Sequence, residues 1–190
     1  MKKRRSLRNI RNSGISDLCA RYRFDTYTTP NSETSHALAK AREYASNPRG
    51  KWFYICGVPG SGKTHLCIGI CNELLNNGYE VRYMLWREVA PQLKSLVTDG
   101  DAYTERMDAL KKASVLYIDD FLKGKVSDAD INLAFELLNA RYNDASKCTI
   151  ISSERSIEDV LGYDEAVGSR IAERSKGFRV AAPKQNWRLK

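Results

Sequence analysis

The sequence has no long apolar segment and few residues suited to holding a metal ion. No stretch of its 190 residues approaches the ~20 apolar residues that a membrane-spanning helix needs, so we expect no membrane partner. The start of the chain is basic, but residues 6–16 offer no apolar core for a secretory signal. The chain has two histidines and five cysteines, and no two cysteines form a CxxC pair. These spacings do not predict a tetrahedral zinc site.

The number of cysteines is odd, and three of them, Cys56, Cys67 and Cys148, lie within apolar runs. We interpret these three as small buried hydrophobic residues in a reducing compartment, which predicts a cytoplasmic protein. The sequence also contains no internal repeat and no low-complexity tract.

The positive charge of the chain is concentrated at its two ends. The formal net charge is +8, with eight basic residues and one acid in residues 1–23, and seven basic residues and one acid in residues 168–190. The residues between these segments carry more acids than bases. This polarity suits a polyanion or an acidic protein partner, and it equally suits two solvated, solubilising ends. We expect a basic N-terminal arm over residues 1–22, as a candidate partner-binding segment, before a domain over residues 23–190.

Short apolar runs alternate with segments of helical periodicity along the rest of the chain. The hydrophobic content of 42% is enough for a folded core, and Asp128 is the expected N-cap of one helix. The alternation predicts an α/β fold with a mostly parallel five-stranded sheet that is flanked by helices. The expected strands are residues 52–56, 80–85, 114–118, 147–151 and 178–181. The expected helices are residues 15–22, 31–45, 63–76, 87–98, 101–112, 128–142, 157–161 and 165–174.

One motif carries specific chemistry, because residues 57–64 match G-x-x-x-x-G-K-[ST] in full, after an expected strand and at the start of an expected helix. Glycines let the backbone fold around phosphate oxygens, and the N–H groups at the helix N-terminus supply partial positive charge. Lys63 is expected to reach the β- and γ-phosphates, and the Thr64 hydroxyl to ligate Mg²⁺. A plain glycine-rich turn would have no use for this Lys-Thr pair. ATP and Mg²⁺ are therefore the expected cofactors.

The residues expected to contact the nucleotide run one position past this motif. His65 belongs to this nucleotide-binding set, and we interpret it as a helix-surface or packing residue rather than as a catalytic one. The full set is Gly57, Val58, Pro59, Gly60, Ser61, Gly62, Lys63, Thr64 and His65.

Asp119 and Asp120 follow the expected strand 114–118 directly. A carboxylate at the carboxyl end of a parallel strand lies in the crevice where α/β proteins bind ligands. One acid of such a pair can hold Mg²⁺, directly or through water, and its neighbour can polarise a water for attack on the γ-phosphate. A solvated turn is the alternative, and the complete phosphate-binding motif upstream makes it the weaker one.

Two further segments are candidates for contact with the γ-phosphate. Residues 152–155 close the fourth expected strand, and they either sense the phosphate or form an ordinary polar strand end. Arg170 and Arg174 lie on one helix face because they are four residues apart. They are interpreted either as an arginine finger that acts on a neighbouring subunit's ATP or as surface ion-pair partners, such as Arg170 with Glu173 or Glu165.

Together these motifs resemble the AAA+ ATPases of the DnaC-type replicative helicase loader family, including its phage and prophage members, which is related to the IstB-type ATPases. The phosphate loop is generic to many NTPases, whereas its combination with the strand-end acids, the fourth-strand serines and residues 168–171 is more specific. The resemblance covers about residues 20–190. It implies a P-loop NTPase core of the AAA+/ASCE kind, with a small or absent C-terminal lid.

The resemblance implies roles for the residues singled out above. Lys63 and Thr64 match Walker A, Asp119 matches the Walker B magnesium ligand, and Asp120 stands where many relatives have a catalytic Glu. Asp120 is one methylene shorter than Glu, which predicts slow hydrolysis that assembly or a partner stimulates. The residues expected to act in catalysis are Asp120, Lys63, Arg170, Arg174 and Ser153, and those expected to hold the metal are Thr64 and Asp119.

Three further implications concern the edges of the site. Phe24 and Tyr27 are expected to lie near the adenine. Sensor 1 in this family is commonly Asn, but this chain has Glu154 there, so either Ser153 serves instead or Glu154 turns away. Arg188 is a weak match for the sensor 2 arginine.

The function implied is an ATP-dependent loader that binds a replicative DNA helicase and helps to place it on single-stranded DNA during DNA replication. A homo-oligomer in the ATP state is expected. The alternatives are an IstB-type transposition-helper ATPase and a nucleotide-gated interaction module with little hydrolysis. A small-molecule kinase is disfavoured, because the run after Asp120 is too short for a mobile lid. Trp86 is a weak candidate for stacking on single-stranded bases, and a place in the core is the stronger expectation.

Overall fold

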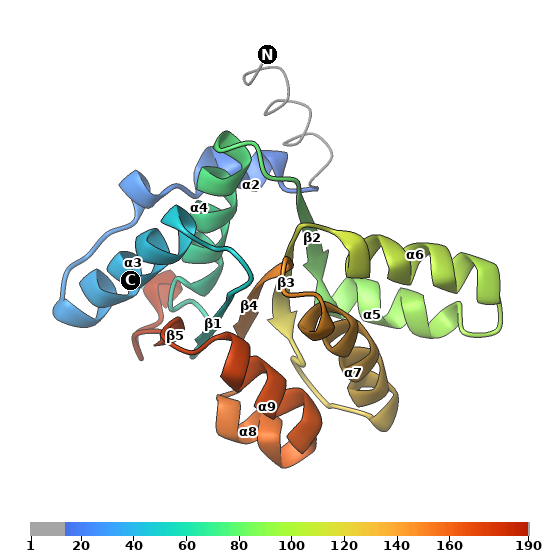
Figure 1. Ribbon diagram of the computed structural model, residues 1–190. Helices are drawn as coiled ribbons and strands as arrows, with labels where there is room; N and C mark the ends of the chain where they lie inside the picture. The colour runs from blue at the N-terminus through green and yellow to red at the C-terminus, as the bar shows by residue number, and fades with distance from the viewer. Residues whose placement is uncertain (1–13, 190) are drawn as a thin grey trace.

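The computed structural model describes residues 14–189, so residues 1–13, which make up most of the expected arm, lie outside the described part of the chain. Within it, parallel strands form one sheet in the order β2-β3-β4-β1-β5. Their carboxyl ends therefore meet at one edge of the sheet (Figure 1). The expected α/β fold with a parallel five-stranded sheet is confirmed. The strands are β1 (Trp52–Cys56), β2 (Val81–Leu85), β3 (Val115–Phe121), β4 (Cys148–Ser153) and β5 (Arg179–Ala181).

The helices lie close to their expected places, with one difference in capping. Ser127 rather than Asp128 caps α7, because Ser127 is extended and its hydroxyl accepts a hydrogen bond from the Asp130 N–H at 3.3 Å. The helices are α2 (Ser16–Arg21), α3 (Ser32–Ser46), α4 (Lys63–Asn76), α5 (Trp86–Ser95), α6 (Gly100–Lys112), α7 (Asp128–Asn143), α8 (Ile157–Tyr163) and α9 (Glu165–Arg174). Short 3-10 turns are η1 (Phe24–Thr26) and η2 (Trp187–Leu189).

The two faces of the sheet pack against different sets of helices. Phe53 and Ile55 of β1 belong to a core layer with α2, α3 and α4, whereas Trp52 and Tyr54 belong to a layer with α5 to α9. Figure 1 shows these two groups of helices on opposite sides of the sheet. Alternate strand residues point to opposite faces, so β1 to β4 contribute to both layers, whereas the short edge strand β5 contributes only Val180, to the layer of α2, α3 and α4. Burial of both faces explains why β1 and the first four residues of β3 are continuous apolar runs.

The first described residues belong to the folded domain. Ile15 and Cys19 are 1% and 6% exposed and pack in the layer of α4, and the Asn72 amide donates to the Cys19 carbonyl at 3.0 Å. The folded unit thus begins before residue 23, the start expected from the sequence. The sequence predicts an arm here because basic residues surround this short helix. The structure shows that α2 nevertheless packs against α4 through Cys19.

Phe24 also packs against α4, over a glycine. A β-carbon built on Gly69 would lie 2.6 Å from Phe24 Cδ1, so only glycine leaves room for the ring at this point of the helix. Phe24 is 5% exposed, and the Arg42 guanidinium lies 5.1 Å from its ring centre on the outer side. Phe24 was expected near a nucleotide base, but its ring is part of the core and does not line the cavity at the phosphate loop.

We expect Gly69→Ala to lower the free energy of unfolding by about 1–3 kcal/mol, because the added methyl group forces the Phe24 ring out of its place. Gly162→Ala is the matched control, since Gly162 is also helical and a β-carbon there meets nothing within 4 Å. It should raise stability by up to about 1 kcal/mol through helix propensity. Urea denaturation of both variants checks this, and equal effects would show that Phe24 does not depend on the glycine.

A buried arginine joins the helical layer of α6 and α7 to the sheet. Arg141 is 0% exposed, and its guanidinium donates to the carbonyls of Leu110 at 2.9 Å, Ala113 at 2.8 Å and Cys148 at 2.6 Å. It also donates to the Thr149 hydroxyl at 3.0 Å. Burial lowers the pKa of Arg141 to about 10. The carbonyls at the end of α6 carry partial negative charge, which compensates the cation in place of a carboxylate.

Three smaller findings complete the fold. None of the helices in the described part is both long and apolar enough to cross a membrane. Cys67 and Cys148 are buried as expected, whereas Cys56 is half-buried. Between β5 and residue 189 the chain forms only the turn η2 and no helical lid, and the side chain of Arg188 lies outside the described atoms.

Candidate nucleotide-binding site

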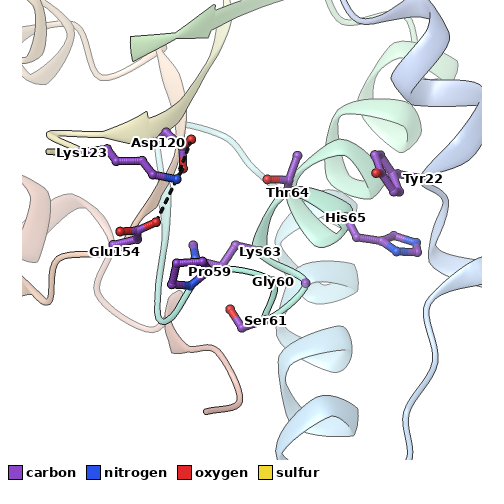
Figure 2. Close-up of a pocket in the computed structure, with 11 residues that line it drawn as sticks. Tyr22, Pro59, Gly60, Ser61, Lys63, Thr64, His65, Asp120, Lys123 and Glu154 are labelled. Carbon is purple, nitrogen blue, oxygen red and sulfur yellow. Dashed lines mark hydrogen bonds and ion pairs between the residues drawn. The ribbon is translucent and has the colours of Figure 1, made fainter. Parts of the chain in front are cut away.

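A cavity of about 240 Å³ opens at the carboxyl edge of the sheet, where the loop between β1 and α4 faces the ends of β3 and β4. Figure 2 shows this loop curving around the cavity, with His65 and Tyr22 beyond the start of α4. Most of the expected nucleotide-binding residues are thus brought together. The lining residues are Tyr22, Pro59, Gly60, Ser61, Gly62, Lys63, Thr64, His65, Asp120, Lys123 and Glu154.

The loop has the backbone shape that its glycines permit. Gly60 and Gly62 have φ values of +74° and +89°, in the left-handed region that other residues rarely adopt. Gly62 is the N-cap of α4, so the first N–H groups of this 14-residue helix point toward the cavity. The C-terminal segment packs on the loop, since the Trp187 N–H donates to the Gly60 carbonyl at 3.0 Å. That last contact had no sequence signal.

Lys63 is held inside the loop. Its ammonium group donates to the carbonyls of Gly57 at 2.7 Å and Val58 at 2.9 Å, and the residue is 6% exposed. Burial lowers the pKa of Lys63, and the nearby Glu154 and Asp120 oppose that effect. In the described part of the chain, the Ser61 hydroxyl is buried and has no hydrogen-bond partner. A buried hydroxyl, a buried cation and a helix N-terminus together fit an anionic phosphate group.

Asp119 is buried at the centre of a polar network at the end of β3. One carboxylate oxygen accepts hydrogen bonds from the hydroxyls of Thr64 at 3.3 Å and Ser152, and the other accepts one from the Tyr83 hydroxyl at 3.1 Å. Burial, followed by the charge of Asp119, raises the pKa of Tyr83 well above its usual value. The network fixes a carboxylate beside the Thr64 hydroxyl, an oxygen pair suited to Mg²⁺. Tyr83 and Ser152 were not expected there.

Strand β3 is longer than expected and contains both acids. Its register against β4 shifts between Ile118 and Phe121, and Asp120 has a φ of +54°. Such a bulge turns a side chain away from the regular strand direction. It separates the two carboxylates, so Asp119 stays buried while Asp120 reaches the cavity wall.

Asp120 and Glu154 share one cation. The Lys123 ammonium lies 3.2 Å from an Asp120 carboxylate oxygen and 2.9 Å from a Glu154 oxygen, as the dashed lines in Figure 2 show. Glu154 therefore does not turn away from the site: it lines the cavity with its charge paired. The sequence motif gave no sign of Lys123.

Ser153 is placed differently from its expected position at the γ-phosphate. Its hydroxyl donates to the Phe121 carbonyl at 2.8 Å and accepts from the Arg155 N–H at 3.0 Å, and the residue is 0% exposed. It does not line the cavity. The hydroxyl instead fastens the end of β3 to β4, because backbone groups around the bulge need hydrogen-bond partners.

An aromatic cluster borders the cavity on the side of α4. The His65 ring lies 5.0 Å from the Tyr22 ring and 5.2 Å from the Tyr27 ring. His65 Nε2 is 2.9 Å from the Arg23 carbonyl, which can only accept, so this nitrogen carries the proton. Burial lowers the pKa of His65, which favours the neutral ring. Tyr27 lies beside the loop, since a β-carbon built on Gly62 would be 3.0 Å from its Cε2, and His65 and Tyr22 line the cavity. A place for Tyr27 near the adenine stays a prediction, and Tyr22 was not expected there.

Arg170 and Arg174 lie away from the cavity, between α7 and α9. Arg170 stands over the Phe135 and Tyr142 rings at 5.2 and 5.4 Å, and its Nε donates to the Asn139 side chain at 3.0 Å. Arg174 is 5.7 Å from the Tyr142 ring. Among the described residues neither arginine forms the ion pair that was the alternative interpretation. Aromatic and amide groups hold them on this face of the domain instead.

Comparison with known protein families settles what kind of domain this is. The model of the family described as IstB-like ATP binding protein matches residues 8–174. The chain belongs to this family. The phosphate loop, the Asp119 network and the parallel sheet are therefore those of an IstB/DnaC-like AAA+ domain, and the resemblance inferred from the sequence is confirmed.

Individual relatives of this IstB-like protein agree with that assignment. The phage-like element PBSX protein XkdC of Bacillus subtilis is 37% identical over 145 residues, which cover 71% of this chain and 53% of XkdC. The replicative helicase loader DnaC of Escherichia coli is 31% identical over 175 residues, which cover 89% of this chain and 69% of DnaC. The chain spans about half the length of its Bacillus subtilis relatives.

The fold of the IstB-like domain is also found among solved structures. A crystal structure of the DnaC helicase loader superposes with a TM-score of 0.77 at 24% identity, covering 87% of this chain and 99% of that one. The likeness shows the shared α/β architecture.

Proposed function

We propose that this protein is an ATP-dependent helicase loader, which binds a replicative DNA helicase and helps to place it on single-stranded DNA. The observation that carries the proposal is the juxtaposition of the phosphate loop with the Asp119 network on a DnaC-like domain. Membership of the family supports nucleotide binding, and the relatedness to DnaC supports a helicase as the partner.

The residues of the site fit a magnesium nucleotide. Lys63 uses two of its three N–H donors on loop carbonyls, which leaves a donor for a phosphate oxygen. The Ser61 hydroxyl and the N–H groups at the start of α4 would complete the cradle, and Thr64 with Asp119 would hold Mg²⁺. When bound, the metal neutralises charge on the phosphates. The neutral ring of His65, with Tyr27 and Tyr22, offers flat apolar faces at the border of the cavity.

Hydrolysis would depend on Asp120 as the group that accepts a proton from water. In the structure the Asp120 carboxylate is paired with the Lys123 ammonium. The Asp120 side chain is also one methylene shorter than that of Glu, so its carboxylate would reach less far toward a γ-phosphate. We infer slow hydrolysis that a partner or assembly stimulates. The same contact favours a second candidate, a nucleotide-gated interaction module with little hydrolysis.

Assembly in the ATP state would bring in groups from a neighbouring copy. Arg170 and Arg174 are placed together on α9 and are proposed to reach the ATP of the adjacent subunit, with Arg170 as the leading candidate. The basic residues at the chain ends would contact the helicase or the phosphate backbone of single-stranded DNA. The match to the IstB-like family favours a transposition-helper ATPase as the other alternative.

A pull-down separates these functions. We expect the tagged chain to retain a replicative helicase with ATP and Mg²⁺, and to retain less with ADP or without nucleotide. A transposase of the type served by IstB proteins is the matched bait. Failure to retain any helicase in all three nucleotide states contradicts the loader proposal, and retention of the transposase alone favours the alternative.

The same pull-down, together with a titration of ATP, tests the basic arm. Residues 1–13 contain six basic residues and no acid. Their deletion should remove helicase or DNA binding while ATP affinity stays within about twofold of the full chain. Equal loss of both activities would show that the segment serves the fold rather than the partner.

A further inference from the structure

Lys123 occupies a position in the nucleotide cavity that no motif assigns. Its ammonium group lies 2.9 Å from Glu154 Oε1 and 3.2 and 3.3 Å from the two carboxylate oxygens of Asp120. All three side chains line the cavity together with Lys63 (Figure 2). Lys123 is thus a second cation beside the proposed phosphate position, and it bridges the two acids there.

The backbone holds Lys123 in this place from both sides. Its N–H donates to the Asp120 carbonyl at 3.1 Å, which closes a tight turn after β3. Leu122, inside that turn, has a φ of +52° and is 1% exposed, so its side chain anchors the turn in the core. The Gly124 carbonyl accepts from the Arg155 guanidinium at 2.9 Å. The bridging cation is therefore presented by a fixed turn and not by a free loop.

The turn is tied to the strand end that carries Glu154. The Ser153 hydroxyl donates to the Phe121 carbonyl, and Arg155 binds Gly124, so contacts from both neighbours of Glu154 reach the Lys123 turn. This construction keeps the Lys123 ammonium and the Glu154 carboxylate within ion-pair distance. Burial opposes the charge of the ammonium, but its bonds to Glu154 and Asp120 outweigh that effect and raise the pKa of Lys123.

The charge balance of the cavity gives Lys123 its importance. The charged side chains that line the cavity are Lys63, Lys123, Asp120 and Glu154, so they cancel. Without Lys123, two carboxylates would face a polyphosphate with Lys63 as the single cationic side chain among the described residues that line the cavity. Charges of like sign repel more strongly in a partly buried site than in water, because solvent screens them less there. A triphosphate would be repelled more than a diphosphate, because its additional phosphate group brings further negative charge into the same cavity.

We propose that Lys123 is a positioning residue of the nucleotide site, which neutralises Glu154 and holds the Asp120 carboxylate so that a nucleoside triphosphate can bind beside both acids. The proposal rests on the proposed nucleotide-binding function. It explains how an acid occupies the sensor 1 position: Glu154 and Lys123 act as one paired unit. It also makes Lys123 a determinant of the preference for ATP over ADP.

Calorimetric titration with ATP and with ADP, in the presence of Mg²⁺, tests this in the full chain. Lys123→Gln should weaken ATP binding about tenfold and ADP binding less than about threefold. Lys123→Gln combined with Glu154→Gln should recover most of the ATP affinity, because the uncompensated acid is gone. Lys123→Arg should stay within about twofold of the unmodified chain. Lys125→Gln, an exposed lysine two residues away, is the control for loss of charge alone and should change neither affinity.

The outcomes distinguish this inference from the function beneath it. If the unmodified chain binds no ATP, both fall. If the unmodified chain binds ATP, and Lys123→Gln binds ATP and ADP with the same affinities as the unmodified chain, only the role of Lys123 is refuted. If Lys123→Gln lowers the ATP affinity equally with and without Glu154→Gln, the proposed role of Lys123 is also refuted, because Lys123 would then act independently of Glu154. A variant that merely loosened the turn would weaken both nucleotides alike and would not respond to the second substitution.

Discussion

Lys63→Ala should weaken ATP binding by about 100-fold or more. The substitution removes a buried cation that already lies on the carbonyls of Gly57 and Val58, in the middle of the loop. Its third donor is free for a phosphate oxygen, and a hydrogen bond to a charged group contributes about 1.5–3 kcal/mol, of which the upper end corresponds to about 100-fold in affinity. Equilibrium titration with ATP and Mg²⁺ measures it.

The control for Lys63→Ala is Lys125→Ala, which removes an exposed lysine outside the cavity and should leave the ATP affinity unchanged. Thermal melting shows whether Lys63→Ala is still folded, as expected for a change confined to the cavity lining. ATP affinity equal to that of the unmodified chain would refute the assignment of this loop as the phosphate cradle.

Arg141→Met should lower the free energy of unfolding by about 3–5 kcal/mol, because a buried acceptor left without its donor costs about 1–3 kcal/mol and several acceptors are left here. The guanidinium joins α7 to the end of α6 and the start of β4, and its removal leaves the carbonyls of Leu110, Ala113 and Cys148 buried without this donor. Methionine fills much of the volume but donates no hydrogen bond. Urea denaturation at pH 7 gives the change directly.

Arg106→Met serves as the control for Arg141, because Arg106 is an exposed arginine on α6 and its replacement should change stability by no more than about 0.5 kcal/mol. Arg141→Lys should fall between the two, since an ammonium group satisfies only part of the carbonyl set. A loss below about 1 kcal/mol for Arg141→Met would mean that water replaces the guanidinium and that the joint between α6 and the sheet is not held by Arg141.

Much of the fold could be read from periodicity. Trp52–Cys56 and Lys63–Asn76 agree with the expected strand and helix residue for residue, because an apolar run and a glycine-rich motif delimit them sharply. Trp86 is 3% exposed and packs on Phe121 at 5.0 Å, so its expected place in the core is confirmed. The end of β3 was missed, because two acids imitate the end of a strand when the bulge that accommodates them is unknown.

The candidate site could be predicted only in part. The residues of the phosphate loop come from one contiguous motif whose spacing carries its own physical reason. Tyr83, Ser152 and Lys123 come from other segments and have no local signal, since a tyrosine in a strand or a lysine in a turn fits many roles. The position of Ser153 at a strand end predicts a contact with the phosphate. Side chains alternate along a strand, however, so the Ser152 hydroxyl donates to Asp119. The Ser153 hydroxyl donates instead to the Phe121 carbonyl.

By itself, the sequence determined the class of the protein. The order of strands and helices, the phosphate loop with Lys63 and Thr64, and the acids at the end of the third strand specify a P-loop AAA+ domain, because these depend on local spacing and backbone freedom. Only the tertiary structure decided which charges meet. The β3 bulge buries Asp119 with Thr64 and turns Asp120 toward Lys123, and the parallel pairing of β3 with β4 brings Glu154 to the same cation. Charge pairing depends on distances across the sheet, which no spacing along the chain contains.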